Sequence, residues 1–171
     1  MRKTLTMVVA ATTMLTLGGA LAAPSSARTT WDTTPVHVTH DVHPTPKVVN
    51  LRVGQHPTYD RVVVDFRGKL AGYDVRYVKA LYYDGTGDEV PLKGARFIQI
   101  RITPAVAHDA AGHSVYVGPT LQQYQMPMLR GAAFIGDFEG DVTFGLALSH
   151  LDTFRVLEVT DPSRLVIDVH H

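Results

Sequence analysis

The sequence predicts an all-β protein folded as an antiparallel β-sandwich. Two observations lead to this prediction: apolar and polar residues alternate with a period of two in several runs, and turn-forming residues separate those runs. The alternation indicates strands with one buried face, because successive side chains of a strand point to opposite sides of the sheet. Turns that recur after short strands favour a sandwich or barrel over alternating strands and helices. No run has the pattern of a long amphipathic helix.

The alternation starts at Lys47 and recurs up to the last residues. Arg61 and Asp65 alternate with apolar neighbours, and Gln99 and Arg101 do the same in a later run. We expect the polar members to face solvent and the apolar members to face the core. The apolar rows are Val62, Val64 and Phe66; Ile98, Ile100 and Ile102; Val142, Phe144, Leu146 and Leu148; and Leu165, Ile167 and Val169.

Turn residues define the connections between these runs. Residues 161–163 read Asp-Pro-Ser and predict a type I turn with Asp first and Pro second. Residues 139–141 read Glu-Gly-Asp and predict a hairpin connection. The segment 104–111 is the best helical candidate, and it is short enough for a single turn. The segment 121–129 contains Pro127, which favours a loop or an irregular edge strand.

Residues 1–27 have the pattern of a secretory signal peptide. Two positive residues are followed by an uncharged stretch from Leu5 to Leu17, and small residues then allow cleavage after Ala22 or Ala27. The apolar stretch is too short for a membrane-spanning helix, which needs about 20 residues. We therefore expect a secreted, extracytoplasmic, cell-wall associated protein with no transmembrane helix in the mature chain.

The next segment, residues 28–46, is rich in Pro, Thr and His and has little apolar periodicity. Such a segment buries too little apolar surface to offset its ordering entropy, so we expect a disordered linker. The folded domain is then expected to span residues 47–171.

Composition excludes several classes of function. The chain has no cysteine, which rules out disulfides and thiolate metal sites. It has 16 basic and 16 acidic residues, so no basic excess points to nucleic acid. We expect no nucleic-acid partner.

Three stretches together resemble the AMIN-like domain of exported actinobacterial proteins. They read HPTYDRVVVDF in residues 56–66, FEGDVTFGL in residues 138–146, and FRVL followed by DPSRLVIDV within residues 154–169. The AMIN-like family is itself similar to the AMIN domain of peptidoglycan amidases and secretins. The resemblance covers roughly Val48 to His170. It implies a β-sandwich that binds peptidoglycan or a cell-envelope protein without catalysis, because the catalytic unit of AMIN-containing enzymes is a separate domain.

Exposed aromatic and arginine side chains are the expected tools for such binding. Sugar rings stack on aromatic rings, and a guanidinium group can bind a peptide carboxylate through two hydrogen bonds. The same residues could instead pack against the sheets or simply be solvated. The ligand-binding candidates are Tyr82, Tyr83, Tyr116, Tyr124, Arg101 and Arg130.

An alternative function is extracellular metal binding or pH sensing through histidine. His37, His40 and His43 are spaced by three residues, and neutral imidazole is a good metal ligand. In a disordered segment, ordering three ligands costs conformational entropy, so solvated histidines are the favoured interpretation. The loop 84–89 contains carboxylates and glycines but lacks the calcium-loop pattern, so we interpret it as a turn. We expect no cofactor.

No enzymatic motif is present. Ser114 and Ser149 each lie beside a histidine, but neighbours in a strand point to opposite faces, so neither pair should form a bond between nucleophile and base. The three carboxylates within residues 137–141 are expected at a polar hairpin tip. We therefore predict that the protein is not an enzyme.

Overall fold

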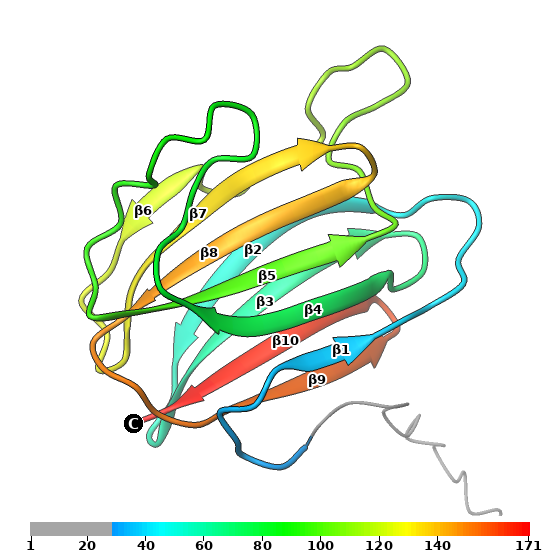
Figure 1. Ribbon diagram of the computed structural model, residues 1–171. Helices are drawn as coiled ribbons and strands as arrows, with labels where there is room; N and C mark the ends of the chain where they lie inside the picture. Colours follow the sequence, from blue (N-terminus) through cyan, green and yellow to red (C-terminus); the bar gives the residue numbers. More distant parts are fainter. Residues whose placement is uncertain (1–28) are drawn as a thin grey trace, which may run out of the picture.

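Two antiparallel sheets face each other in the structure, which is a computed structural model describing residues 29–171 (Figure 1). The prediction of an all-β sandwich is confirmed. The predicted signal peptide over residues 1–27 lies outside the described residues. Within residues 29–171 there is no helix long and apolar enough to cross a membrane.

One sheet has six strands in the order β1-β4-β5-β8-β7-β6, and the other has four in the order β2-β3-β10-β9. Hairpins connect several neighbours, and the chain passes between the sheets after β1, β3 and β8 (Figure 1). The strands are β1 Val36–Val38, β2 Lys47–Gln55, β3 Tyr59–Arg67, β4 Gly72–Val78, β5 Arg96–Thr103, β6 Leu121–Gln123, β7 Leu129–Phe138, β8 Asp141–Leu148, β9 Phe154–Thr160 and β10 Ser163–His170.

The predicted apolar rows form the core between the sheets. All of them are buried, and the three isoleucines of β5 are fully so. In β2 the simple alternation fails, since Val48 and Leu51 are both buried although they are three residues apart. A register shift between Val48 and Asn50 explains this, because a β-bulge inserts one residue and restores the inward direction.

The hairpin between β7 and β8 is confirmed. Glu139 and Gly140 form its two-residue loop, with φ angles of 52° and 85°. Positive φ at both positions is what a type I′ turn requires, and this turn matches the twist of the paired strands. Glycine at the second position adopts such a φ without steric cost.

Two other local predictions are wrong. Strands β9 and β10 already pair at Thr160 and Ser163, so Pro162 is the third residue of the turn, and the Asp161–Pro162 peptide is cis. A type I turn with proline second is therefore not formed. Residues 104–111 contain no helical turn and instead form isolated bridges to neighbouring segments. The edge strand β6 and the loop that follows it up to Met128 confirm the prediction for residues 121–129, whose last residue, Leu129, begins β7.

The segment 29–46 is not a disordered linker, which corrects the prediction for residues 28–46 in the described part of the chain. Its strand β1 pairs with β4, and further upstream Asp32 and Phe154 exchange two backbone hydrogen bonds of 3.0 and 2.8 Å. Val36 and Val42 are each only 6% exposed. The segment, called the N-terminal arm below, thus contacts both sheets along their β4 and β9 edges. The backbone groups at those sheet edges form hydrogen bonds with the segment and so order it, and amino-acid composition alone does not reveal these contacts.

The connection from β4 to β5 folds back over the outer face of the six-stranded sheet (Figure 1). Its apolar residues form a second small core with outward residues of β7 and β8, including Ala133, Ile135 and Ala147. A side chain at Gly145 would place its Cβ 2.5 Å from Leu81, so glycine is needed for this close approach. The connection covers parts of β7 and β8 and packs against Val78 and Phe97, and it leaves the outer face around Arg76, Gln99 and Arg101 open.

Candidate binding groove

A polar hollow of about 290 Å³ opens on this outer face of the six-stranded sheet. A second hollow of about 240 Å³ lies toward β1 and shares Arg76 and Arg101 with the first. We call the two together the outer groove. The first hollow is lined by Arg76, Asp84, Gln99, Arg101, Phe138, Glu139, Asp141 and Thr143, and the second by His37, Tyr73, Asp74, Arg76, Arg101 and Thr103.

Strand alternation and register bring the floor of the groove together. Within the groove the outward residues of β4, β5 and β8 are polar, whereas their inward neighbours belong to the core. The register places Arg76 opposite Gln99 and Arg101 opposite Thr143. Phe138, at the end of β7 beside the hairpin tip, is 62% exposed at the rim.

Hydrogen bonds to neighbouring side chains orient the two arginines. Arg101 donates from Nε to Asp141 at 2.8 Å and from Nη2 to the same oxygen, and this hydrogen bond raises the pKa of Arg101. Arg76 donates to Gln99 at 3.2 Å and lies 3.4 Å from Asp74. Both side chains stay about half exposed, at 55% and 47%. Because a guanidinium has five N–H donors, each arginine retains donors for a ligand.

Asp84 reaches the groove from the turn that connects β4 and β5. Gly136 of β7 has no side chain, and a Cβ at this position would lie 2.4 Å from a carboxylate oxygen of Asp84. Glycine therefore allows the side chain of Asp84 to pack directly against the backbone of β7. The turn that follows is closed by backbone hydrogen bonds of Tyr83 with Gly87 and Asp88, at 2.8 and 2.9 Å. The interpretation of residues 84–89 as a turn is confirmed.

Two of the predicted binding tyrosines pack against the main core. The ring of Tyr116 lies 4.8 Å from Phe134 and 5.7 Å from Phe144, and its hydroxyl donates to Pro119 at 3.1 Å. Burial raises the pKa of Tyr116 well above its usual value. Tyr124 is half-buried against the same core. These contacts account for both rings without a ligand.

The other four predicted binding residues are dispersed. Tyr82 is 53% exposed on the connection between β4 and β5, whereas Tyr83 packs against the second core. Arg130 is half-buried near the start of β7. Of the six predicted residues, Arg101 is the one that lines the outer groove.

The sequence pattern does not single out Arg76 or Thr143 as binding candidates. Both occupy outward positions of alternating strands, and this signal is available in the sequence. Their convergence with Arg101 depends on the register of three strands, which local patterns do not determine.

The histidines of the N-terminal arm do not converge. Each faces a different carboxylate, and in residues 29–171 no group of three or more His, Cys, Asp or Glu side chains is arranged to hold a metal ion. The pairs are His37 with Asp74 at 3.8 Å, His40 with Glu158 at 3.0 Å, and His43 with Asp41 at 3.5 Å.

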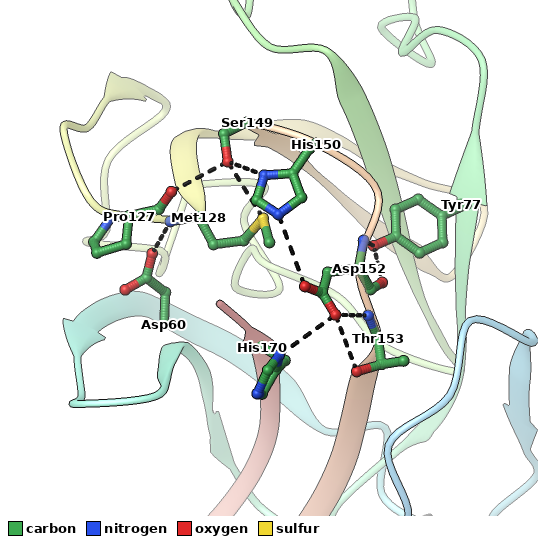
Figure 2. A network of polar contacts seen from close by, with 9 residues as sticks. All are labelled: Asp60, Tyr77, Pro127, Met128, Ser149, His150, Asp152, Thr153 and His170. Carbon is green, nitrogen blue, oxygen red and sulfur yellow. Dashed lines mark hydrogen bonds and ion pairs between the residues drawn. The ribbon is translucent and has the colours of Figure 1, made fainter.

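The prediction that Ser149 and His150 cannot bond is wrong. Ser149 Oγ lies 2.9 Å from His150 Nδ1 (Figure 2). Strand β8 ends at Leu148, so the pair lies in the connection to β9, where strand alternation does not apply. Ser149 Oγ also donates to Pro127 O at 3.1 Å, and His150 Nε2 is 3.7 Å from Asp152, beyond hydrogen-bond length. The geometry therefore lacks the carboxylate–imidazole hydrogen bond of a catalytic triad.

This network instead holds the crossover between the sheets in place (Figure 2). Asp152 accepts a 2.6 Å hydrogen bond from the Thr153 backbone and lies 3.5 Å from His170 on β10. Its backbone oxygen accepts a 2.6 Å hydrogen bond from Tyr77 on β4. Burial by itself would raise the pKa of Asp152, but the contacts with Thr153 and His170 outweigh it and lower that pKa.

The other pair and the hairpin carboxylates have separate partners. His113 lies 3.4 Å from Asp109, and Ser114 faces the backbone of Tyr116. Asp137 accepts a 2.9 Å hydrogen bond from the backbone of Ala107, whereas the next strand's Asp141 pairs with Arg101. Glu139 and Asp141 both line the first hollow, where Asp141 is bonded to Arg101, whereas Asp137 lines a different hollow beside His108, so the three carboxylates do not face one common hollow.

The sequence comparisons agree with this architecture. The AMIN-like domain family matches residues 46–171, well over half of the chain. No curated protein and no solved structure matches the chain. AMIN-like domains are generally non-catalytic binding modules and occur in extracytoplasmic proteins. The chain, whose described residues form a sandwich with an open polar groove, belongs to the AMIN-like domain family.

Proposed function

We propose that this protein is a secreted, non-catalytic module of the cell envelope that binds peptidoglycan through the outer groove. The observation that supports this most directly is the pair Arg76 and Arg101, half exposed on the open sheet face and flanked by carboxylates. Membership of the AMIN-like family supports an envelope-associated binding role in general.

The mixed charge of the groove suits a ligand with both acidic and amino groups. Arg76 and Arg101 provide donors for carboxylates, while Asp84 and Glu139 provide acceptors for ammonium groups. The exposed ring of Phe138 offers an apolar surface on which a sugar ring can stack. Peptidoglycan combines sugar rings with peptides that have carboxylate and amino groups, so its chemistry matches this lining.

Retention on purified sacculi at moderate salt tests the proposal. We expect the wild-type protein to be retained and the double variant Arg76→Ala/Arg101→Ala to bind at least tenfold more weakly, because a lost bidentate contact costs more than 1 kcal/mol. Arg96→Ala is the matched control, since Arg96 is an exposed arginine on the same strand as Arg101 and donates to the backbone of Ala95.

Two results would overturn the proposal. One is a wild-type protein that sacculi do not retain, and the other is a double variant retained as well as the control. Release of soluble wall fragments by the pure protein would contradict the non-catalytic part of the proposal.

A further inference from the structure

The opposite face of the molecule, formed by the outward side chains of the four-stranded sheet, is strongly basic. Its strands present five arginines and one lysine but only two aspartates, a net charge of +4. The described chain as a whole has 13 basic and 16 acidic residues, a net charge of −3, so positive charge is concentrated on this face. We call it the arginine face; its charged residues are Lys47, Arg52, Arg61, Arg67, Arg155, Arg164, Asp65 and Asp168.

Each aspartate of the arginine face lies between two arginines. Asp168 is fully buried and accepts hydrogen bonds from Arg61 at 2.6 and 2.9 Å and from Arg155 at 2.8 Å. Asp65 accepts two 2.7 Å hydrogen bonds from Arg52 and lies 3.5 Å from Arg164. One carboxylate neutralises one guanidinium, so each trio keeps one positive charge.

Aromatic rings hold the first trio in position. The guanidinium carbon of Arg155 lies 4.5 Å from the ring centre of Trp31 and 5.2 Å from that of Tyr59. Arg61 also lies 5.2 Å from the Tyr59 ring. Cation–π contacts and the bond to Asp168 restrict these side chains before any ligand binds, so less entropy is lost on binding. Trp31 comes from the N-terminal arm, so the arm helps to build this face.

The spacing of the trios favours a ligand with several charges. Asp168 pairs in register with Arg61, and Asp65 lies four residues further along β3. At about 3.3 Å per residue the trios are roughly 13 Å apart, too far for one small anion to contact both. Guanidinium groups bind phosphate oxygens through paired hydrogen bonds.

We infer that the arginine face binds a linear anionic wall glycopolymer linked by phosphodiester groups. Charge complementarity and the two positive trios support this occupant. The site lies on the sheet opposite the outer groove, so the polymer and peptidoglycan can be bound at the same time (Figure 1). This goes beyond the proposed function, which concerns the outer groove alone.

Binding of long-chain inorganic polyphosphate over a series of salt concentrations tests the inference. We expect Arg52→Gln/Arg164→Gln to weaken binding at least tenfold and to reduce the slope of log affinity against log salt by about one to two. Arg76→Gln/Arg101→Gln removes the same charge from the opposite face and should leave polyphosphate binding unchanged. Thermal unfolding of each variant verifies folding. The single variant Arg67→Gln alters an exposed side chain of the same face and gives a second measurement of how this face contributes to polyphosphate binding.

Several outcomes would overturn the inference. Equal weakening by both double variants would show that net charge alone matters. If orthophosphate competed as effectively per phosphate group as the polymer does, binding of one ligand to both trios at once would be excluded. Tighter binding of double-stranded DNA or of phosphatidylglycerol vesicles than of polyphosphate would assign the face to a different partner. Retention on sacculi stripped of phosphate polymers should be unaffected by Arg52→Gln/Arg164→Gln, which keeps this test separate from that of the outer groove.

Discussion

The hydroxyl of Tyr73 on β4 donates a 2.9 Å hydrogen bond to the carboxylate of Glu158 on β9 and so joins the two sheets. Both side chains are almost completely buried, at 1% and 2% exposed. Burial, followed by the contact with Glu158, raises the pKa of Tyr73, so the phenol remains a donor. His40 of the N-terminal arm lies 3.0 Å from the same carboxylate oxygen and extends the contact to a third segment.

Replacing Tyr73 with Phe is expected to lower the free energy of unfolding by about 1–3 kcal/mol. The substitution keeps the packed ring but removes a donor from a buried carboxylate, whose desolvation is then less well compensated. Urea denaturation measures the change. Tyr82→Phe, at an exposed tyrosine, should have almost no effect, and an equal loss in both variants would contradict the role assigned to Tyr73.

A second buried carboxylate anchors the start of β7. Asp60 on β3 is fully buried and accepts hydrogen bonds from the backbone N–H groups of Met128 and Leu129, at 2.8 and 2.7 Å. Asp60→Ala is expected to cost about 3 kcal/mol, because two buried donors lose a charged acceptor. Asp60→Asn retains one acceptor oxygen and should cost less. Guanidinium denaturation compares the two variants, and an Ala variant as stable as wild type would refute the anchoring role.

Asp152 makes stability depend on pH in the acidic range. Its pKa is lower in the folded protein than the ordinary value of 3.8, so folding favours the ionised form. The stabilisation is therefore present above about pH 4 and is lost as the pH falls through the folded pKa. We expect the stability difference between wild type and Asp152→Asn to shrink between pH 5 and about pH 2. Thermal unfolding across this range checks it; a difference that grows on acidification would contradict the sign.

The N-terminal arm should contribute to stability as a strand of the sandwich. Val36→Ala removes two buried methyl groups and is expected to cost about 1–2 kcal/mol. The adjacent His37 is exposed, and His37→Ala serves as the control with a change below about 0.5 kcal/mol. Chemical denaturation of the two variants distinguishes an integrated strand from a spacer, since a spacer would tolerate both changes equally.

Much of the fold follows from local pattern. The rows around Val64, Ile100, Phe144 and Ile167 were recognisable by alternation, because a half-buried strand requires it. The Glu139–Gly140 hairpin follows from turn chemistry in the same way. The bulge in β2 could not be predicted in this way, since an inserted residue leaves no distinct local signal in the sequence.

The candidate groove was much less predictable. Arg101 was recognisable as an outward arginine, but Tyr116 and Tyr124 turned out to pack against the core, since tyrosine serves a core and a binding surface equally well. Trp31 belongs to a segment whose composition suggested disorder. Its position over Arg155 depends on the backbone contact of the arm with β9.

The amino-acid sequence by itself determined the class of fold, the family and the inward or outward direction of most strand residues, because these follow from period-two alternation and turn chemistry within a few neighbouring positions. Only the tertiary structure decided that Arg76, Arg101 and Asp84 share one groove, that Arg52 and Arg155 share the opposite face, and that the arm completes a sheet. Those relationships depend on strand register and on contacts between residues far apart in the chain, which no local pattern encodes.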